Sequence, residues 1–181
     1  MQNIKFISID PSLRNTGVAL GKITLEGEVL VEKVVLATTE KESKKKIRVS
    51  TDTINRSRVL YNFLQETIKE FEPKVVFIET PSGSQNASSM KSYGIVCALI
   101  ATITPPPIEV SPIEVKVAFI GDKKASKQQI INKAVELYPD AGWLKIKDRI
   151  LNKNEHCADA VAVAIAGVQT VQFKQLVNYI K

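Results

Sequence analysis

The chain has 181 residues, of which 44% are hydrophobic and 24% are charged, and it carries a formal net charge of +6. This is an ordinary composition for a globular protein, and the length allows one domain that buries roughly two-thirds of its surface. The basic balance is compatible with a polyanionic partner, although many basic proteins bind no nucleic acid.

Features of secreted and membrane proteins are missing from the sequence. The two cysteines, Cys97 and Cys157, lie in apolar helical contexts and suggest neither a disulfide framework nor a zinc cluster. The N-terminus resembles a strand and lacks the charged lead, apolar core and cleavage site of a signal peptide. No apolar run is long enough to span a membrane, so we expect a cytoplasmic protein with no membrane partner.

The first third of the chain predicts three strands, over residues 4–9, 16–25 and 28–37. The second and third strands are separated by a turn at Glu26-Gly27, and short connections of this kind predict antiparallel pairing. The polar and basic segment "TTEKESKKKIRVSTD" follows, and we expect it to be an exposed connection.

The rest of the chain alternates helices and strands. A helix is predicted from Thr53 to Phe71, where apolar residues recur at helical spacing and Pro73 follows as a stop signal. The segment "KVVFIE" predicts a strand that is buried on both faces and ends at Glu79. Further elements are predicted in this order: a helix over about 88–103, a strand over 108–111, a basic helical region with a helix at about 126–138, and a last helix over about 155–170.

This order predicts the fold class. A strand–helix–strand–helix–strand half favours parallel pairing through right-handed crossovers. We therefore expect an α/β fold, with a five-stranded mixed sheet of three antiparallel strands followed by parallel ones, flanked by helices. No internal repeat or long linker divides the chain, so residues 1–181 are predicted to form a single domain.

Acidic side chains occur where strands end and where the last helix begins. Asp10 ends the first strand, Glu79 ends the fourth, and the last helix starts with Glu155, His156 and Asp159. The ends of neighbouring parallel strands meet at one crevice, and residues three apart on a helix share a face. Several anionic groups at one crevice repel one another unless a cation neutralises them. The set therefore suits two magnesium ions about 4 Å apart that hold a scissile phosphate.

Some of these residues also have a structural interpretation, whereas an acid after four apolar strand residues, such as Glu79, seldom serves packing. Asp10 precedes Pro-Ser and is as readily a turn residue, while a histidine at a helix start is more often a surface residue than a ligand. Asp159 is harder to explain in that way, because it lies in an Ala- and Val-rich helix where an unpaired charge is costly. The combination of residues favours a functional site.

Five stretches of the chain resemble a known family, in the family's order and over residues 4 to about 166. They are "SIDPSLRNTGVAL", "RSRVLYNFLQETIKEFEPKVVFIET", "NASSMKSYGIVCALIA", "VSPIEVKVAFIGDKKASKQQI" and "HCADAVAVAIA". The chain is similar to the RuvC-type Holliday-junction resolvases, which are nucleases of the RNase H-like superfamily. Matched to the family's motifs, the four catalytic metal ligands fall on Asp10, Glu79, His156 and Asp159.

The resemblance implies an RNase H-like domain with a specific activity. The expected function is a structure-specific endonuclease that nicks Holliday junctions or other branched DNA, with two Mg²⁺ ions for which Mn²⁺ substitutes. A metal-activated water attacks the phosphorus and leaves 5′-phosphate and 3′-hydroxyl ends, as part of recombination and repair. The resemblance also implies a homodimer formed through the helix over 88–103, in the cytoplasm of a bacterial or phage-infected cell.

The role of His156 stays open at this point. Many family members have Asp at this position, and magnesium prefers oxygen ligands, whereas imidazole suits softer metals such as manganese. His156 is therefore either a ligand or a general acid or base. Glu155, four residues before Asp159, is a rival ligand.

Basic residues near these acids are predicted to bind DNA. Lys116 and Lys127 match family lysines that contact DNA near the scissile phosphate, and Lys123 and Lys124 lie between them. Arg14 follows Asp10 in the same turn and is predicted to position phosphate. The alternative for the lysines is a solvated helical face. The tract "KKKIR", residues 44–48, is either a contact to a duplex arm or solubilising charge.

One departure from the family concerns substrate choice. Some members carry a wedge, an aromatic residue three positions after the strand-end Glu that stacks at the opened junction centre; here that position is Ser82. The lack of a wedge resembles phage-type members, which have broader activity on branched DNA. The alternatives are an RNase H-fold nuclease that acts on RNA, a branched-DNA-binding module that does not cleave, and an actin-like ATPase, for which the chain is too short.

Overall fold

A five-stranded sheet forms the centre of the protein in the computed structural model, which describes residues 3–43, 46–81, 83, 86–147 and 149–180. The strands lie in the order β3-β2-β1-β4-β5. Their bounds are β1 (Ile4–Asp10), β2 (Asn15–Ile23), β3 (Val29–Thr38), β4 (Val75–Glu79) and β5 (Ile108–Val110). The first three pair antiparallel, whereas β1 with β4 and β4 with β5 pair parallel, as the sequence predicted.

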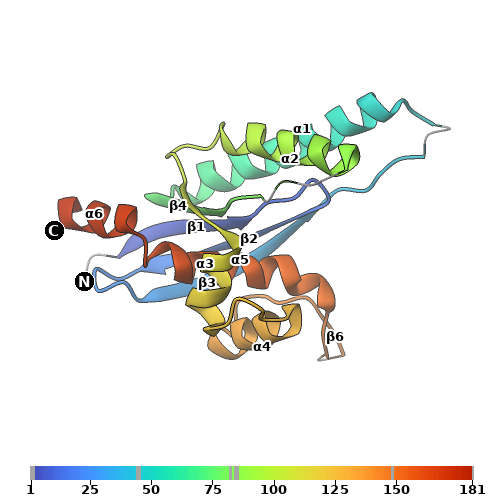
Figure 1. The fold of residues 1–181 in the computed structure, drawn as a ribbon. Helices are drawn as coiled ribbons and strands as arrows, with labels where there is room; N and C mark the ends of the chain where they lie inside the picture. Colours follow the sequence, from blue (N-terminus) through green and yellow to red (C-terminus); the bar gives the residue numbers. More distant parts are fainter. Residues whose placement is uncertain (1–2, 44–45, 82, 84–85, 148, 181) are drawn as a thin grey trace.

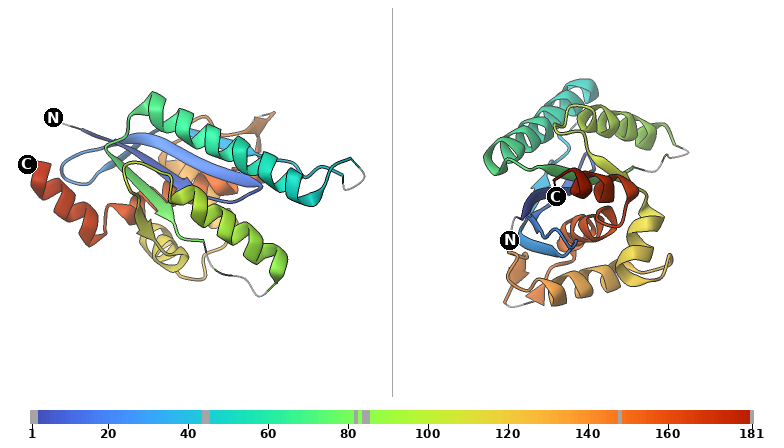
Figure 2. Two further views of the ribbon diagram at one scale, coloured as in Figure 1. Left: turned by 90° about the horizontal axis from the view of Figure 1, so that it is seen from above. Right: turned by 90° about the vertical axis from the view of Figure 1, so that its left-hand side faces the viewer.

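Helices cover both faces of this sheet (Figures 1 and 2). The helices α1 (Val49–Phe71) and α2 (Ala87–Ile100) lie together on one face. On the other face, α5 (Glu155–Gly167) lies against the sheet, with α3 (Pro112–Ile120) and α4 (Lys127–Leu137) packed outside it. The larger cluster of buried apolar side chains lies on the α5 face, and the smaller one lies under α1.

Small residues let α5 approach the sheet closely. Nine of its residues are buried, mostly Ala and Val, because the helix is sandwiched between the sheet and the outer helices. Gly17 in β2 faces the start of α5, and an added Cβ there would overlap the backbone carbonyl of His156. Gly167 at the other end of α5 similarly leaves space for the ring of Phe77. Side-chain size therefore fixes how closely the helix lies on the strands.

The structure corrects several predicted boundaries. The helix α1 begins at Val49, four residues before the predicted start. The predicted last helix over 155–170 is too long, because α5 ends at Gly167 and a separate helix, α6 (Val171–Ile180), follows. The hydroxyl oxygen of Thr170 accepts the backbone N–H of Phe173 at 3.2 Å, which caps the start of α6. The sequence analysis also missed a short hairpin, β6 (Lys145–Ile146) and β7 (Arg149–Ile150).

Within the described ranges, no single helix is long and apolar enough to cross a membrane. The segments Asn152–Gly167 and Val171–Tyr179 pass this test only when they are taken together, and they are bent by 64° at the break between them.

Candidate active site

Two acidic side chains lie next to each other at the carboxyl ends of β1 and β4. The parallel pairing of Ile9 with Ile78 puts Asp10 and Glu79, each the next residue along its strand, at one edge of the sheet. Both side chains are half-buried, so each is open to solvent on one side. The predicted convergence of strand-end carboxylates is therefore present.

The start of α5 brings two further side chains to this edge. Nδ1 of His156 lies 2.6 Å from Oδ2 of Asp10. Asp159 follows one helical turn later on the same face. Gly17 lies opposite Asp10 in the antiparallel pair of β1 and β2, and its missing side chain leaves room for the backbone of His156. These contacts join residues from both ends of the chain.

A buried serine fixes the helix to the strand. The hydroxyl of Ser8, two residues before Asp10, donates a hydrogen bond of 2.7 Å to the backbone carbonyl of Ala160. Ala160 directly follows Asp159, so this bond sets the depth of the helix relative to β1. The sequence analysis missed Ser8, because a serine in an apolar strand has no sequence signal that identifies its partner.

The carboxyl groups at this edge influence one another strongly. Burial, and next the charges of Asp10 and Asp159, raise the pKa of Glu79 to about 8, although Lys116 and His156 partly oppose this rise. Burial and the charge of Asp10 raise the pKa of Asp159 to about 7, against an opposing effect of His156 and Lys127. These acids therefore form one electrostatic site in which full ionisation is unfavourable unless a cation is present.

The imidazole of His156 is held between two carboxylates. Burial lowers its pKa, but the hydrogen bond and the charge of Asp10, with smaller effects of Glu155 and Asp159, raise the pKa above its ordinary value overall. Nε2 of His156 lies 3.5 Å from Oε1 of Glu155. The other oxygen of Glu155 pairs with Nζ of Lys127 at 3.0 Å. Glu155 thus faces the basic side of the site, and His156 faces Asp10.

The donor set of this site suits a divalent cation such as Mg²⁺ or Mn²⁺. It offers three carboxylates and one imidazole, and the mutual repulsion of the carboxylates is what a cation would relieve. Within the part of the chain that the structure describes, no three His, Cys, Asp or Glu side chains are arranged to hold one ion. The hydrogen bond between His156 and Asp10 holds two of the donors against each other, and metal binding would have to replace it.

The predicted DNA-binding residues lie at different distances from the acids. Lys116 on α3 is half-buried and close enough to Glu79 to affect its pKa. Lys127, the first residue of α4, pairs with Glu155. Lys123 and Lys124 are exposed on the loop between α3 and α4, and Arg14 is exposed on the turn between β1 and β2. Lys116 and Lys127 therefore lie beside the acids, whereas the other three lie on outer loops.

A polar network that the sequence did not reveal holds the turn with Arg14. The guanidinium of Arg56 on α1 donates to the hydroxyl of Thr39 at 2.9 Å and to the carbonyl of Leu13 at 3.1 Å. Asp52, buried one turn earlier on α1, lies 3.8 Å from Arg56 and accepts the N–H of Glu42. The network fixes the turn from the opposite face of the sheet.

Two of the predicted features lie outside the described residues. They are Ser82, at the position of the family's aromatic wedge, and Lys44 and Lys45 of the basic tract. The expected breadth of activity on branched DNA, and the resemblance to phage-type members, stay predictions.

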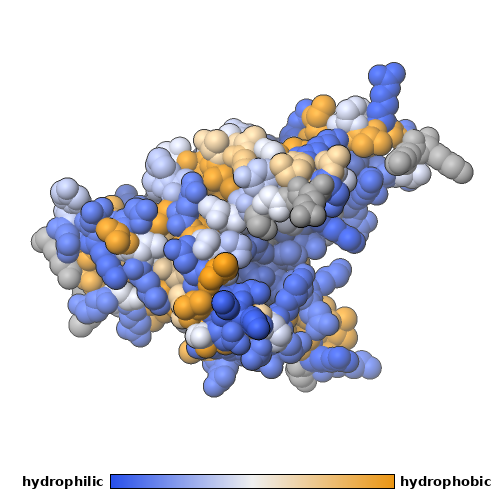
Figure 3. Space-filling model, in the orientation of Figure 1, coloured by the Kyte–Doolittle hydropathy of each residue, from blue (hydrophilic) through white to orange (hydrophobic). Residues whose placement is uncertain are grey.

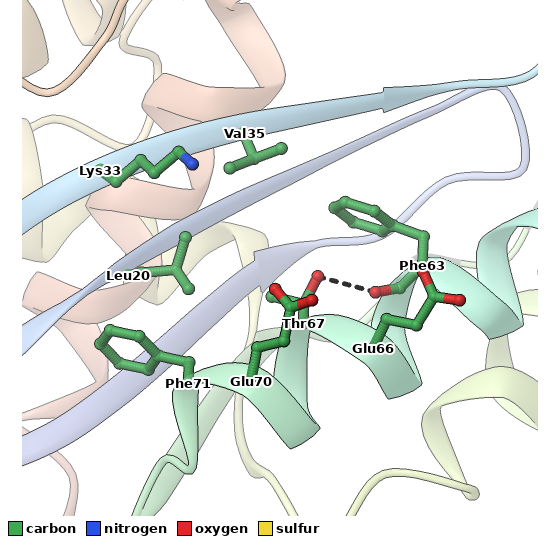
Figure 4. A pocket seen from close by; sticks show the side chains of 8 residues that line it. All are labelled: Leu20, Lys33, Val35, Phe63, Glu66, Thr67, Glu70 and Phe71. Carbon is green, nitrogen blue, oxygen red and sulfur yellow. Dashed lines mark hydrogen bonds between the residues drawn. The ribbon is translucent and has the colours of Figure 1, made fainter.

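A separate pocket lies on the α1 face of the sheet (Figure 4). Its volume is about 450 Å³, and side chains of α1, including Phe63 and Phe71, line it together with Leu20 and Lys33 of the strands. In Figure 4 the hydroxyl of Thr67 bonds to the carbonyl of Phe63 within α1. Because none of the proposed metal ligands lines this pocket, it is distinct from the candidate active site.

Comparisons with known proteins agree with this geometry. The family model described as "Crossover junction endodeoxyribonuclease RuvC" matches residues 6–167. The curated protein of that name from Carboxydothermus hydrogenoformans is 28% identical over 168 residues, which covers 91% of this chain and 95% of the relative. The one from Geotalea uraniireducens is 32% identical over 133 residues and covers 70% and 71%, respectively.

The fold is also similar to that of solved structures. The structure described as T. thermophilus RuvC in complex with Holliday junction substrate has a TM-score of 0.64 and 19% identity to this chain, and the match covers 90% of this chain and 92% of that one. At this identity the likeness concerns the fold alone, which is RNase H-like as the sequence predicted. Because the family model covers most of the sequence, the chain belongs to the RuvC family of crossover junction endodeoxyribonucleases.

Proposed function

We propose that this protein is a crossover junction endodeoxyribonuclease, a single RNase H-like domain over residues 1–181 that nicks four-way DNA junctions. The observation that carries the proposal is the convergence of Asp10, Glu79 and Asp159 with His156 at one edge of the sheet. Lys116 and Lys127 lie beside these acids and would attract the phosphate that the carboxylates repel.

Nucleases of this family are metal-dependent. We infer that Asp10, Glu79, His156 and Asp159 would together hold two Mg²⁺ ions, with Mn²⁺ as a substitute. When bound, magnesium supplies an activated water and neutralises the charge that develops on the phosphate. The chain itself contributes the fixed edge of the sheet and the buried helix α5, which keep the ligands in register.

His156 is a better candidate ligand than Glu155. Its Nδ1 faces Asp10 at 2.6 Å, whereas Glu155 is engaged by Lys127. The variant His156→Asp tests this assignment, because Asp preserves a metal ligand but replaces the imidazole. Cleavage retained with Mg²⁺ would support a ligand role. Loss of cleavage with unchanged metal binding would instead indicate that His156 donates a proton.

We propose that the protein acts as a homodimer through α2. This helix buries only Val96 among its residues and exposes Gly94 and Ala98, which allow close packing of a second copy. A four-way junction has two-fold symmetry, and paired nicks on opposing strands need two related active sites. Ala98→Glu should turn the dimer into a monomer in sedimentation experiments and abolish paired nicking.

The central experiment compares labelled substrates with and without Mg²⁺. A synthetic four-way junction should receive paired symmetric nicks, and linear duplex should stay intact. Cleavage of an RNA/DNA hybrid in preference to the junction would favour the RNA nuclease, and binding without cleavage under several metals would favour a silent module. Cleavage by Asp10→Asn would show that the proposed site is wrong. The proposed setting is recombination and repair in the cytoplasm of a bacterial or phage-infected cell.

A further inference from the structure

The connection between α4 and α5 carries an exposed basic hairpin. The basic hairpin consists of the described residues 144–147 and 149–153 and contains β6 and β7. Ile146 pairs with Arg149 across it. Lys147, which follows Ile146, has a φ of 45°. Asp148 lies outside the described residues. The exposed basic side chains of the hairpin are Lys145, Lys147, Arg149 and Lys153.

A buried asparagine holds the base of the basic hairpin. The side-chain amide of Asn154 donates to the carbonyls of Leu144 and Leu151 at 2.8 and 2.9 Å. Its carbonyl oxygen accepts the N–H of Leu144 at 2.9 Å. The two strands also meet where the N–H of Leu151 donates to the carbonyl of Leu144 at 3.0 Å. The hairpin therefore projects from a fixed base.

This base is continuous with the candidate active site. Asn154 directly precedes Glu155 and lies two residues before His156 in the chain. Figure 1 shows β6 at the same end of the molecule as the start of α5. Figure 3 shows a hollow with a largely hydrophilic surface on this side, between the region of α1 and α2 and the region of α4 and β6. A nucleic acid bound in the candidate site would have to extend along α1 and α2 or along α4 and β6.

No ion pair among the described residues uses the charges of the basic hairpin. The segment 141–154 contains four basic residues and one acid, Asp148, which gives it a net charge of +3. Ile146 is 60% exposed among these cations. Cationic side chains with an exposed apolar side chain suit a DNA backbone and its sugars or base edges.

We propose that the basic hairpin binds a duplex arm of the DNA that occupies the active site. Lys145, Lys147, Arg149 and Lys153 contact phosphates, and Ile146 packs against sugars or base edges. Because Asn154 fixes the hairpin to the start of α5, the bound arm is held in a constant register relative to the scissile phosphate. This inference rests on the proposed function, since it assumes that DNA is the substrate.

The test measures how junction binding depends on salt, in EDTA so that no cleavage occurs. The variant combines Lys145→Ala, Lys147→Ala and Arg149→Ala. The matched control combines Lys69→Ala, Lys74→Ala and Lys174→Ala, which removes three exposed charges from the last turn of α1, the residue before β4, and α6. The logarithm of the binding constant K falls linearly with the logarithm of the salt concentration. Each lost phosphate contact should make this negative slope less steep by about 0.9.

We expect the hairpin variant to lose about two to three units of slope. We also expect it to bind at least about tenfold more weakly at 0.1 M salt, while the control keeps the wild-type slope. Ile146→Ser should weaken binding several-fold with an unchanged slope. Thermal unfolding should show that all variants are folded. A hairpin variant with the wild-type slope and affinity would overturn the proposal, and so would an equal loss in the control.

The readout separates this inference from the proposed function. If the wild type binds the junction but never cuts it, the proposed function is wrong, and the slopes still decide whether the hairpin binds DNA. If the wild type binds no DNA, both proposals are overturned. If only the hairpin variant changes its sedimentation in the absence of DNA, the hairpin contacts protein instead, and the inference is wrong.

Discussion

The two faces of the sheet are built differently. On one face, α5 is almost wholly buried between the sheet and other helices, and it carries His156 and Asp159. On the other face, α1 is longer but buries only three of its 23 residues, namely Asp52, Leu60 and Leu64. The helix that carries two of the four candidate ligands is therefore the more deeply buried of the two.

This difference separates the two roles that a buried acid can have. Asp159 on α5 lies among other acids, which raise its pKa, and no hydrogen bond neutralises that repulsion within the described residues. Asp52 on α1 is also buried, but it accepts a backbone N–H and lies next to Arg56. We infer that the first acid is kept for function at a cost in stability, whereas the second stabilises the fold.

The largest expected effect comes from replacing Asp159 with its amide. Asp159→Asn should lower the rate of junction cleavage by about a thousandfold or more, because a metal ligand supplies several kcal/mol of transition-state stabilisation. Its melting temperature in metal-free buffer at pH 8 should rise, since one repelling charge is lost.

Asp52→Asn is the matched control for that prediction. It should lower stability by about 1 kcal/mol, because it removes the charge beside Arg56, and change cleavage by less than about tenfold. Cleavage assays and thermal unfolding measure both effects. If Asp52→Asn abolished cleavage and Asp159→Asn did not, the assignment of the two faces would be reversed.

A pair of glycine substitutions tests the difference in packing. Gly17→Ala should destabilise the protein by about 3 kcal/mol and abolish cleavage, because the added Cβ would overlap the His156 carbonyl and push α5 off the sheet. Gly94→Ala on α2 should raise the stability of the monomer by up to about 1 kcal/mol, since nothing in the same chain lies within 4 Å of its Cβ and Ala favours a helix, although the added Cβ would weaken the packing of a second copy in the proposed dimer.

Urea unfolding at several protein concentrations measures both glycine variants, because a dimer would make the midpoint depend on concentration. Equal destabilisation by the two substitutions would contradict the idea that only the α5 face is closely packed.

The pH dependence of stability should come from the α5 face. Folding raises the pKa of Glu79 from its ordinary value of 4.5 to about 8 and the pKa of Asp159 from 3.8 to about 7. The folded state therefore binds more protons than the unfolded state across this range, so stability falls as pH rises. The raised pKa of His156 acts in the same direction.

We expect the melting temperature in EDTA to decrease between about pH 5 and pH 8. The decrease should be smaller with Mg²⁺ and smaller in Asp159→Asn. Apparent Mg²⁺ affinity should rise over the same range, because the ligands must lose their protons. A melting temperature that rises with pH in EDTA would contradict the proposed repulsion.

The smallest expected effect concerns Ser8. Ser8→Ala removes the hydrogen bond to the Ala160 carbonyl and should cost about 1 kcal/mol, with a several-fold loss of cleavage as α5 shifts against β1. Ser57→Ala on α1 is the control, because its hydroxyl donates to the carbonyl of Thr53 within its own helix. It should change stability by less than about 0.5 kcal/mol. Equal effects in calorimetry would mean that the bond of Ser8 has no positioning role.

The sequence alone predicted the main strands and helices and the four candidate ligands. Hydrophobic periodicity is a local property, so it located β1, β4 and α5 to within a few residues at most boundaries. The alternation of elements also predicted parallel pairing of β1 and β4, and this pairing made it possible to expect Asp10 beside Glu79.

Tertiary contacts decided how these residues are used. The Ser8–Ala160 and Asp10–His156 bonds join residues 152 and 146 positions apart, and no local pattern specifies such partners. The end of α5 at Gly167 and the start of α6 depend on the cap at Thr170, and the basic hairpin depends on the buried Asn154. The sequence determined which groups are available, because residue type and spacing are local. Only the fold decided which groups face one another, because packing between distant segments sets distance, burial and charge.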